Sequence, residues 1–254
     1  MHLPTHDEPP DSAIQRASDR RRWFRAINFS LAFVLVLVAT FSAQSSFDVG
    51  AWMVQPWSLV GLRGVLTAPL LHGSLEHLAA NAFSLLMLGT LAGGLYPRAT
   101  LRALPVMWLG AGLGAWLLGE AGSRHLGASG VTHGLMFLVF VLGLLRRDRP
   151  AIAAAMIAFL LYGGMLLTVL PREAGVSWQA HLGGAVGGVI AALVFRRQDP
   201  SPPAKRYSWE LEEDAEPEPD DELEPPAPKE VPVLWERPEE PRGTVLPFRP
   251  PRGK

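Results

Sequence analysis

Six long apolar stretches constrain the fold of this 254-residue chain more than any other feature of its sequence. Each is almost free of charge and close to the roughly 20 residues that a helix needs to cross a bilayer. Backbone polar groups find no water in lipid, so such stretches are expected to form helices. The sequence therefore predicts an all-α membrane protein with six transmembrane helices: Ala26–Ala43, Leu75–Leu95, Leu101–Leu118, Ser129–Leu145, Ala151–Leu170 and Ala180–Phe195.

Arginines flank these stretches asymmetrically and predict the topology. One side has only Arg63, Arg124 and Arg172. The other side has Arg20, Arg21, Arg22, Arg25, Arg98, Arg102, Arg146, Arg147, Arg149, Arg196 and Arg197. The positive-inside rule then places both termini in the cytoplasm. The first stretch is interpreted as a retained anchor, not a cleaved signal sequence, because a long polar arm precedes it and further spans follow.

The two ends of the chain differ in composition from its middle. We expect a flexible, basic cytoplasmic arm over residues 1–25, a membrane domain over 26–197 and a disordered, acidic, Pro-rich cytoplasmic tail over 198–254. Up to Gln198 there are 15 Arg and Lys against 9 Asp and Glu, whereas from Asp199 onward there are 8 against 15. The tail has too few apolar residues to form a core. The absence of cysteine excludes disulfides and thiolate metal sites.

Polar residues stand at the start of alternate predicted helices. His77 and Asn81 lie in the second, Ser129 opens the fourth, and His181 lies at the start of the sixth. These three helices run in the same direction, so their polar residues meet at one membrane face. Polar side chains are costly in lipid and are expected to face the bundle interior or a wet cavity. A helix over Ser129–Leu145 spans about 25 Å of a roughly 30 Å core, which places Ser129 several Å below the outer surface.

Glycines follow two of these polar residues at helical spacing. Gly130 and Gly134 follow Ser129, and Gly184 and Gly188 follow His181. Small residues four apart let two helices approach closely enough for side chains to hydrogen-bond across the contact. The pattern predicts that the fourth and sixth helices pack tightly against each other.

Three motifs in this order resemble the rhomboid intramembrane serine proteases: His77-xxx-Asn81, Gly127-Ala128-Ser129-Gly130 and Ala180-His181-xx-Gly184-xxx-Gly188. The resemblance covers about Leu66 to Arg196. It implies a rhomboid-like helix bundle that cleaves transmembrane or membrane-anchored protein substrates within or just outside the lipid bilayer, near the outer membrane face. It also implies a multi-pass protein of a bacterial inner membrane, with no cofactor, no metal and no nucleic-acid partner; the oligomeric state is left open.

The chemistry of these residues is coherent with that resemblance. Ser129 is the expected nucleophile and His181 the base that removes its proton. No acidic residue lies in the last three predicted helices, so a Ser-His dyad is expected instead of a triad. His77 and Asn81 share one helical face and are expected, with the Ser129 backbone N–H, to stabilise the oxyanion. His72, in the preceding loop, is a further candidate.

His133 departs from the resemblance, because better-known rhomboids often have an aromatic residue at this position. Its ring lies one helical turn after Ser129 and competes with His181 for the role of base. We expect His133 to pack beneath His181 and orient it without taking the proton.

Two alternatives remain open on sequence alone. A catalytically silent rhomboid-like protein that binds membrane clients would use the same bundle, but would not need this combination of polar residues. A metal site is the second alternative, because imidazole is a good transition-metal ligand and several histidines fall on the outer side. These histidines are His72, His77, His125, His133 and His181.

Overall fold

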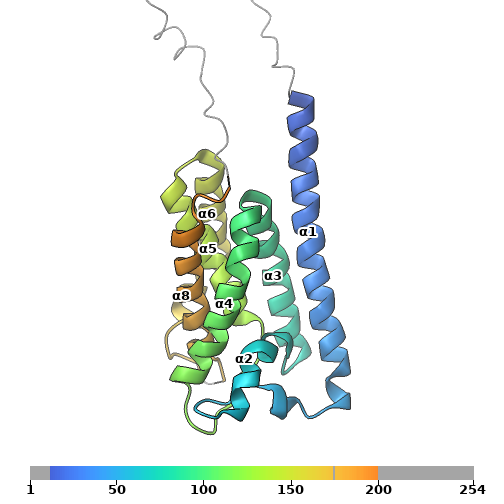
Figure 1. Ribbon diagram of the computed structural model, residues 1–254, viewed down its shortest axis with the longest axis vertical. Coiled ribbons are helices and arrows are strands. Elements are labelled where there is room, and N and C mark those ends of the chain that lie inside the picture. The colour runs from blue at the N-terminus through green and yellow to red at the C-terminus, as the bar shows by residue number, and fades with distance from the viewer. Residues whose placement is uncertain (1–11, 174, 200–254) are drawn as a thin grey trace, which may run out of the picture. The chain divides into compact units, whose positions relative to one another are not determined.

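The computed structural model of this protein describes residues 12–173 and 175–199 as a bundle of helices (Figure 1). Within those residues no strand forms; two short backbone segments pair in an isolated bridge between Val54 and His125. The predicted all-α fold is thereby confirmed. The longer helices are α1 (Ser12–Ala43), α3 (Leu75–Leu95), α4 (Pro97–Leu118), α5 (Ser129–Arg146), α6 (Arg149–Tyr162) and α8 (Trp178–Phe195), and the short ones are α2 (Gly64–Thr67) and α7 (Met165–Thr168).

Five of the described helices are long and apolar enough to cross a membrane: α1, α3, α4, α5 and α8. The predicted fifth span, Ala151–Leu170, differs from the prediction. Its α-helix α6 has only 14 residues, which is about 21 Å at 1.5 Å per residue. At Gly163 and Gly164 the backbone hydrogen bonds span three residues instead of four: Leu166 N donates to Gly163 O at 3.0 Å. The separate turn α7 follows, so this segment is not one continuous α-helix.

Helix α1 begins at Ser12, well before the predicted start at Ala26. Residues 12–25, expected to be part of a flexible arm, are therefore helical. Contacts at helical spacing stabilise this extension: Arg22 lies 3.2 Å from the Asp19 carboxylate, and the Arg20 guanidinium lies 5.4 Å from the centroid of the Phe24 ring. The first eleven residues of the expected arm lie outside the described residues.

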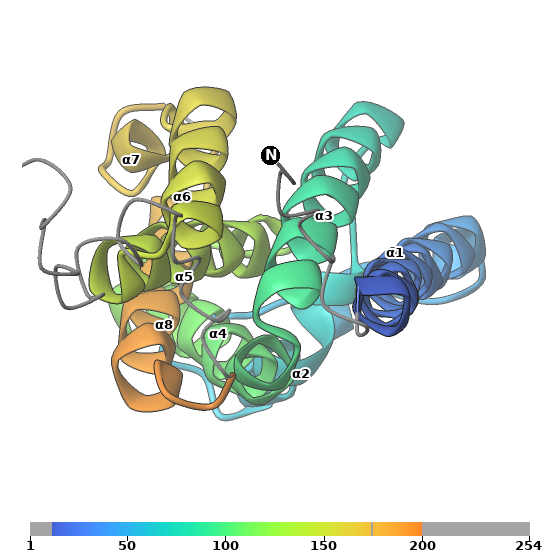
Figure 2. The same ribbon diagram turned by 90° about the horizontal axis from the view of Figure 1, so that it is seen from above.

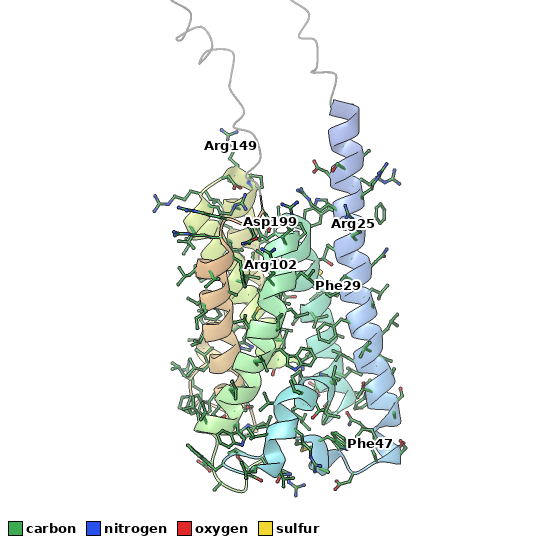
Figure 3. The ribbon with its side chains drawn as sticks, viewed as in Figure 1. Arg25, Phe29, Phe47, Arg102, Arg149 and Asp199 are labelled. Carbon is green, nitrogen blue, oxygen red and sulfur yellow. The ribbon has the colours of Figure 1, made fainter. Side chains whose placement is uncertain are left out.

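Asp199, assigned from sequence to the acidic tail, belongs to the folded domain. Its carboxylate accepts hydrogen bonds from the backbone N–H groups of Arg98 at 3.0 Å and Ala99 at 2.9 Å. It thus satisfies free donors at the start of α4. Arg146 donates to the Asp199 carbonyl at 3.0 Å. Figure 3 shows Asp199 at the end of the bundle where Arg25, Arg102 and Arg149 also lie. The tail from residue 200 onward lies outside the described residues.

Helix α8 packs against both α4 and α5 (Figure 2). The predicted contact with α5 is present, since a methyl group at Gly184 would clash with the backbone of Gly130 and one at Gly188 with the backbone of Gly134. A second glycine face, not foreseen from sequence, packs on α4: a methyl group at Gly183 would clash with the backbone of Gly110. Small residues on two faces let α8 lie tightly between its neighbours.

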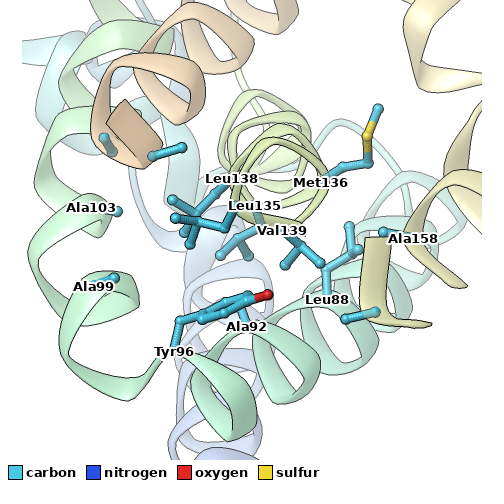
Figure 4. Close-up of a cluster of buried hydrophobic side chains, with 14 of the residues drawn as sticks. Leu88, Ala92, Tyr96, Ala99, Ala103, Leu135, Met136, Leu138, Val139 and Ala158 are labelled. Atoms are coloured by element: carbon cyan, nitrogen blue, oxygen red, sulfur yellow. The ribbon is translucent and has the colours of Figure 1, made fainter. Parts of the chain in front are cut away.

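A cluster of apolar side chains from α3, α4, α5, α6 and α8 packs together inside the bundle (Figure 4). Leu88, Ala103, Leu138 and Val139 are at most 1% exposed there. Large apolar side chains also cover the outside of the bundle, among them Phe29, Leu160 and Val194. An apolar exterior around a packed interior is what a bilayer requires.

We predict that Gly184→Ala lowers the free energy of unfolding by about 1–3 kcal/mol, because the added methyl group would force α5 and α8 apart. The midpoint of chemical unfolding in detergent, followed by circular dichroism, measures this effect. Gly164→Ala is the matched control, since a Cβ there meets no atom within 4 Å and is expected to be neutral or slightly stabilising. Equal losses in both variants would contradict the packing account.

Candidate active site

The starts of α3, α5 and α8 meet at one end of the bundle around a cavity of about 1020 Å³. Ser129, His181, His133, His77 and Asn81 all line it, together with residues of the loops before α5 and α8. The structure thus brings together five polar residues predicted from the sequence. They come from three helices and are up to about a hundred positions apart in the chain.

Ser129 is the first residue of α5, and the turn before it fixes its position. Gly127 has a φ of +112°, which L side chains rarely adopt. A Cβ at Gly127 would also lie 2.6 Å from the His77 ring, so the glycine lets that imidazole approach the turn. The loop is anchored upstream, where Val54 and His125 exchange two backbone hydrogen bonds of 3.0 Å.

His181 and Ser129 are in hydrogen-bonding contact. The His181 Nε2 lies 2.8 Å from the Ser129 Oγ, and its Nδ1 lies 3.0 Å from the backbone carbonyl of Thr168. A carbonyl can only accept, so Nδ1 must carry the ring proton, and Nε2 then presents its lone pair to the serine hydroxyl. His181 is only 6% exposed. This is the arrangement that a general base requires before it takes a proton from a nucleophile.

His133 lies against His181, with the ring centroids 3.9 Å apart and the ring planes 14° from parallel. Its Nδ1 donates to the backbone carbonyl of Ser129 at 2.7 Å, not to the hydroxyl. Its Nε2 lies 2.8 Å from the Thr168 Oγ1. The ring is thus stacked beside His181 and faces the serine main chain, an arrangement consistent with an orienting role.

His77 and Asn81 occupy one face of α3. Asn81 Nδ2 donates to the His77 carbonyl at 2.9 Å, which leaves one amide hydrogen without an assigned bond. Ser74 caps this helix by accepting from the His77 backbone N–H at 3.1 Å. Both side chains border the same cavity as Ser129.

His72 lies beside this pair but does not line the cavity. Its ring is fully buried, edge-on to His77 at a centroid distance of 5.1 Å. Gln44, just after α1, holds the His72 backbone on both sides: it donates to the carbonyl at 2.8 Å and accepts from the N–H at 2.9 Å. The location favours support of His77 over direct contact with a reacting group.

His125 connects the loop before α5 to the start of α8. Its Nδ1 lies 2.7 Å from the Ser177 Oγ, and its Nε2 lies 2.9 Å from the Ser123 Oγ. Ser177 is the N-cap of α8, accepting from the Ala180 backbone N–H. This histidine therefore links the loop that precedes Ser129 to the helix that positions His181.

The metal alternative does not fit the positions of the histidines. His72 and His77 form one pair, His133 and His181 another, and His125 bonds to serines. Within the described part of the chain, no three His, Cys, Asp or Glu side chains are placed to hold one ion.

Comparison with known proteins then decides the family. The rhomboid domain matches residues 56–198, more than half of the chain and all of its site residues. The chain belongs to the rhomboid family. An uncharacterized protein of Mycobacterium tuberculosis (strain H37Rv) is 38% identical over 199 residues, covering 73% of this chain and 82% of that protein. An uncharacterized protein of Mycobacterium leprae is 40% identical over 142 residues, covering 53% and 56% of the two chains.

Thr168 is the residue of this rhomboid's site that sequence reasoning missed. It contacts both imidazoles, yet it comes from a stretch that was predicted to be a uniform transmembrane helix. The available signal was the pair Gly163-Gly164 followed by a hydroxyl residue within that apolar stretch.

We predict that His72 makes the folded rhomboid acid-sensitive. Burial, and then the neighbouring His77, lower the pKa of His72 from 6.5 to about 4. Stability is then independent of His72 above pH 6.5 and is lost as the pH falls from 6.5 toward 4, because only the unfolded chain binds the proton. The loss amounts to roughly 2–3 kcal/mol.

Chemical unfolding in detergent at pH 7 and at pH 4.5 measures this dependence. His72→Gln cannot titrate in this range and is expected to lose less stability than the wild type between the two pH values. A variant with the same pH dependence as the wild type would rule out His72 as the source.

Proposed function

We propose that this rhomboid is an intramembrane serine endopeptidase that uses Ser129 and His181 as a dyad. The observation that carries the proposal is the 2.8 Å contact between Ser129 Oγ and His181 Nε2, with His181 Nδ1 already bonded to a carbonyl. A serine hydroxyl is a weak nucleophile unless a base faces it in the correct tautomer. That requirement is met by these two side chains.

The reaction follows from this geometry in two halves. Ser129 Oγ attacks the peptide carbonyl carbon while its proton moves to His181 Nε2. When the tetrahedral intermediate collapses, the C–N bond breaks and the same proton goes to the leaving amine. Water then attacks the acyl ester, His181 takes a proton from it, and Ser129 recovers its hydroxyl proton as the acid leaves.

The oxyanion would form beside the start of α5. This helix has no side-chain cap, in contrast to α3, α6 and α8. The first N–H groups of a helix have no partner within it. In α5 the Val131 N–H already donates to the Ala128 carbonyl, so the N–H groups of Ser129 and Gly130 are the ones available to a negatively charged oxygen. His77 and the second amide hydrogen of Asn81 border the same space. Together they supply the donors that a tetrahedral intermediate needs.

Transmembrane protein segments are the substrates that this location favours. The 18 residues of α5 measure about 27 Å, against a hydrocarbon core of about 30 Å, so Ser129 lies near one membrane surface. The arginine distribution supports the assignment of that surface to the outer face, with both termini in the cytoplasm. The mycobacterial relatives support a bacterial inner membrane as the location. A helical substrate hides its carbonyls in its own hydrogen bonds, so it must unwind before attack. Segments with Gly, Pro or small polar residues near that face should be preferred.

The tails would lie across the membrane from this site. The tail predicted over residues 198–254, without Asp199, is proposed to lie in the cytoplasm, to serve recruitment or turnover and to take no part in the chemistry. The alternative to a protease is a silent rhomboid-like protein that binds membrane clients. The following experiment separates the two.

Purified protein in liposomes should cleave a reporter protein with one transmembrane segment. Ser129→Ala and His181→Ala are expected to lower kcat by several orders of magnitude, because each removes a partner of the same proton transfer. His133→Phe keeps an aromatic ring against His181 and is expected to retain activity within about tenfold.

The ranking of these variants carries the test. An active His181→Ala with a dead His133→Phe would move the base to His133. Binding of the reporter without cleavage by the wild type would favour the client-binding alternative. Activity that is lost with a chelator and restored by zinc would favour metal chemistry.

A further inference from the structure

Thr168 contacts both imidazoles of the site although it belongs to neither helix that bears them. It is the last residue of α7, the single turn that follows the break at Gly163 and Gly164. The last carbonyls of a helix have no partner within it. The Thr168 carbonyl is therefore free to accept from outside the turn, and it accepts from His181 Nδ1 at 3.0 Å.

The protons around His133 have one consistent arrangement. Its Nδ1 faces the Ser129 carbonyl at 2.7 Å and must be the donor there. A neutral ring then has only a lone pair on Nε2, and the Thr168 hydroxyl at 2.8 Å is its donor. The hydroxyl has one proton, so its longer contact of 3.1 Å with the Met165 carbonyl is the weaker alternative. A doubly protonated His133 would place a positive charge 3.9 Å from the ring that must accept a proton.

We propose that Thr168 is the positioning residue of the dyad: its carbonyl fixes the tautomer of His181 and its hydroxyl fixes the tautomer of the stacked His133. The inference rests on the proposed function of Ser129 and His181. Thr168 is not among the residues that line the cavity at Ser129. It acts through two rings whose stacking leaves His181 with little freedom to turn away from Ser129.

The carbonyl also substitutes for the acid of a catalytic triad. Among residues 12–173 and 175–199, no carboxylate forms a hydrogen bond with His181 or His133. When His181 takes the serine proton, its Nδ1–H bond to the Thr168 carbonyl becomes charge-assisted and strengthens. A carbonyl therefore stabilises the imidazolium without an ionised carboxylate, which is costly at membrane depth.

Thr168→Val removes the hydroxyl, keeps the shape and leaves His133 Nε2 buried without a donor. We expect kcat for reporter cleavage to fall roughly 10- to 100-fold, with KM within about threefold, because the base loses its alignment while the substrate contacts remain. Thr168→Ser keeps the hydroxyl and is expected to recover kcat to within about threefold of wild type. Thr100→Val is the matched control, since the buried Thr100 hydroxyl has no hydrogen-bond partner in the described part of the chain.

A second substitution distinguishes positioning from simple loss of packing. Adding His133→Phe to Thr168→Val removes both partners of the lost bond, and replacing both partners by apolar groups is far less costly than orphaning one. The double variant is expected to be more active than Thr168→Val alone. A kcat for Thr168→Val within twofold of wild type would overturn the role of the hydroxyl. The role of the hydroxyl would also be overturned if the fold-loss in kcat of the double variant equalled the product of the fold-losses of Thr168→Val and His133→Phe.

The proton arrangement is tested without any turnover. Solid-state NMR of ¹⁵N-histidine-labelled protein in bilayers at pH 7 is expected to show His181 and His133 protonated at Nδ1 only, with signals assigned by their loss in His181→Gln and His133→Phe. Protonation of His181 at Nε2, or a cationic His133, would overturn the inference even in a rhomboid without protease activity. The converse result is a wild type that shows the expected tautomers and fails to cleave the reporter. That result would contradict the proposed function and leave the inference about Thr168 intact.

Discussion

The contact between α5 and α8 is the interaction on which the site depends. Gly184 lies so close to the backbone of Gly130 that no side chain fits between them, and Gly188 repeats this contact one turn further along. In lipid, helices gain little from burying apolar surface against each other, so close packing of backbones supplies much of the attraction. The same closeness brings His181 within 2.8 Å of Ser129. The same glycines therefore allow the two helices to pack and bring His181 into contact with Ser129.

A second level of support comes from neutral groups that surround the two imidazoles. Backbone carbonyls of Ser129 and Thr168 accept from the rings, and one hydroxyl completes the set. An ionised acid in this place would have to be desolvated near the membrane interior. Carbonyls provide orientation without that cost. The network depends on the turn α7, which follows the end of α6 at Tyr162.

The sequence predicted the parts of this architecture that leave a periodic or compositional signal. Apolar length located five of the spanning helices, and the glycines after Ser129 and His181 indicated their contact. The sequence does not predict the end of α6, because Gly163 and Gly164 lie in a stretch that is apolar on both sides of them. Thr168 lies in the same apolar stretch, so its sequence context does not indicate a site residue. Part of its proposed role also belongs to its backbone carbonyl, which every residue has. The start of α1 lies in a polar stretch without apolar periodicity, which favours a flexible arm, although Asp19 and Arg22 pair at helical spacing.

Covalent labelling tests the central claim of a formed Ser129–His181 dyad most directly. A fluorophosphonate probe should modify the folded protein in membranes at a single residue, and mass spectrometry should identify that residue as Ser129. The reaction should be abolished by Ser129→Ala or by heating, and strongly slowed by His181→Ala, because the serine is nucleophilic only while the imidazole faces it. Labelling that persists in Ser129→Ala, or that is equally fast without the His181 imidazole, would contradict the account.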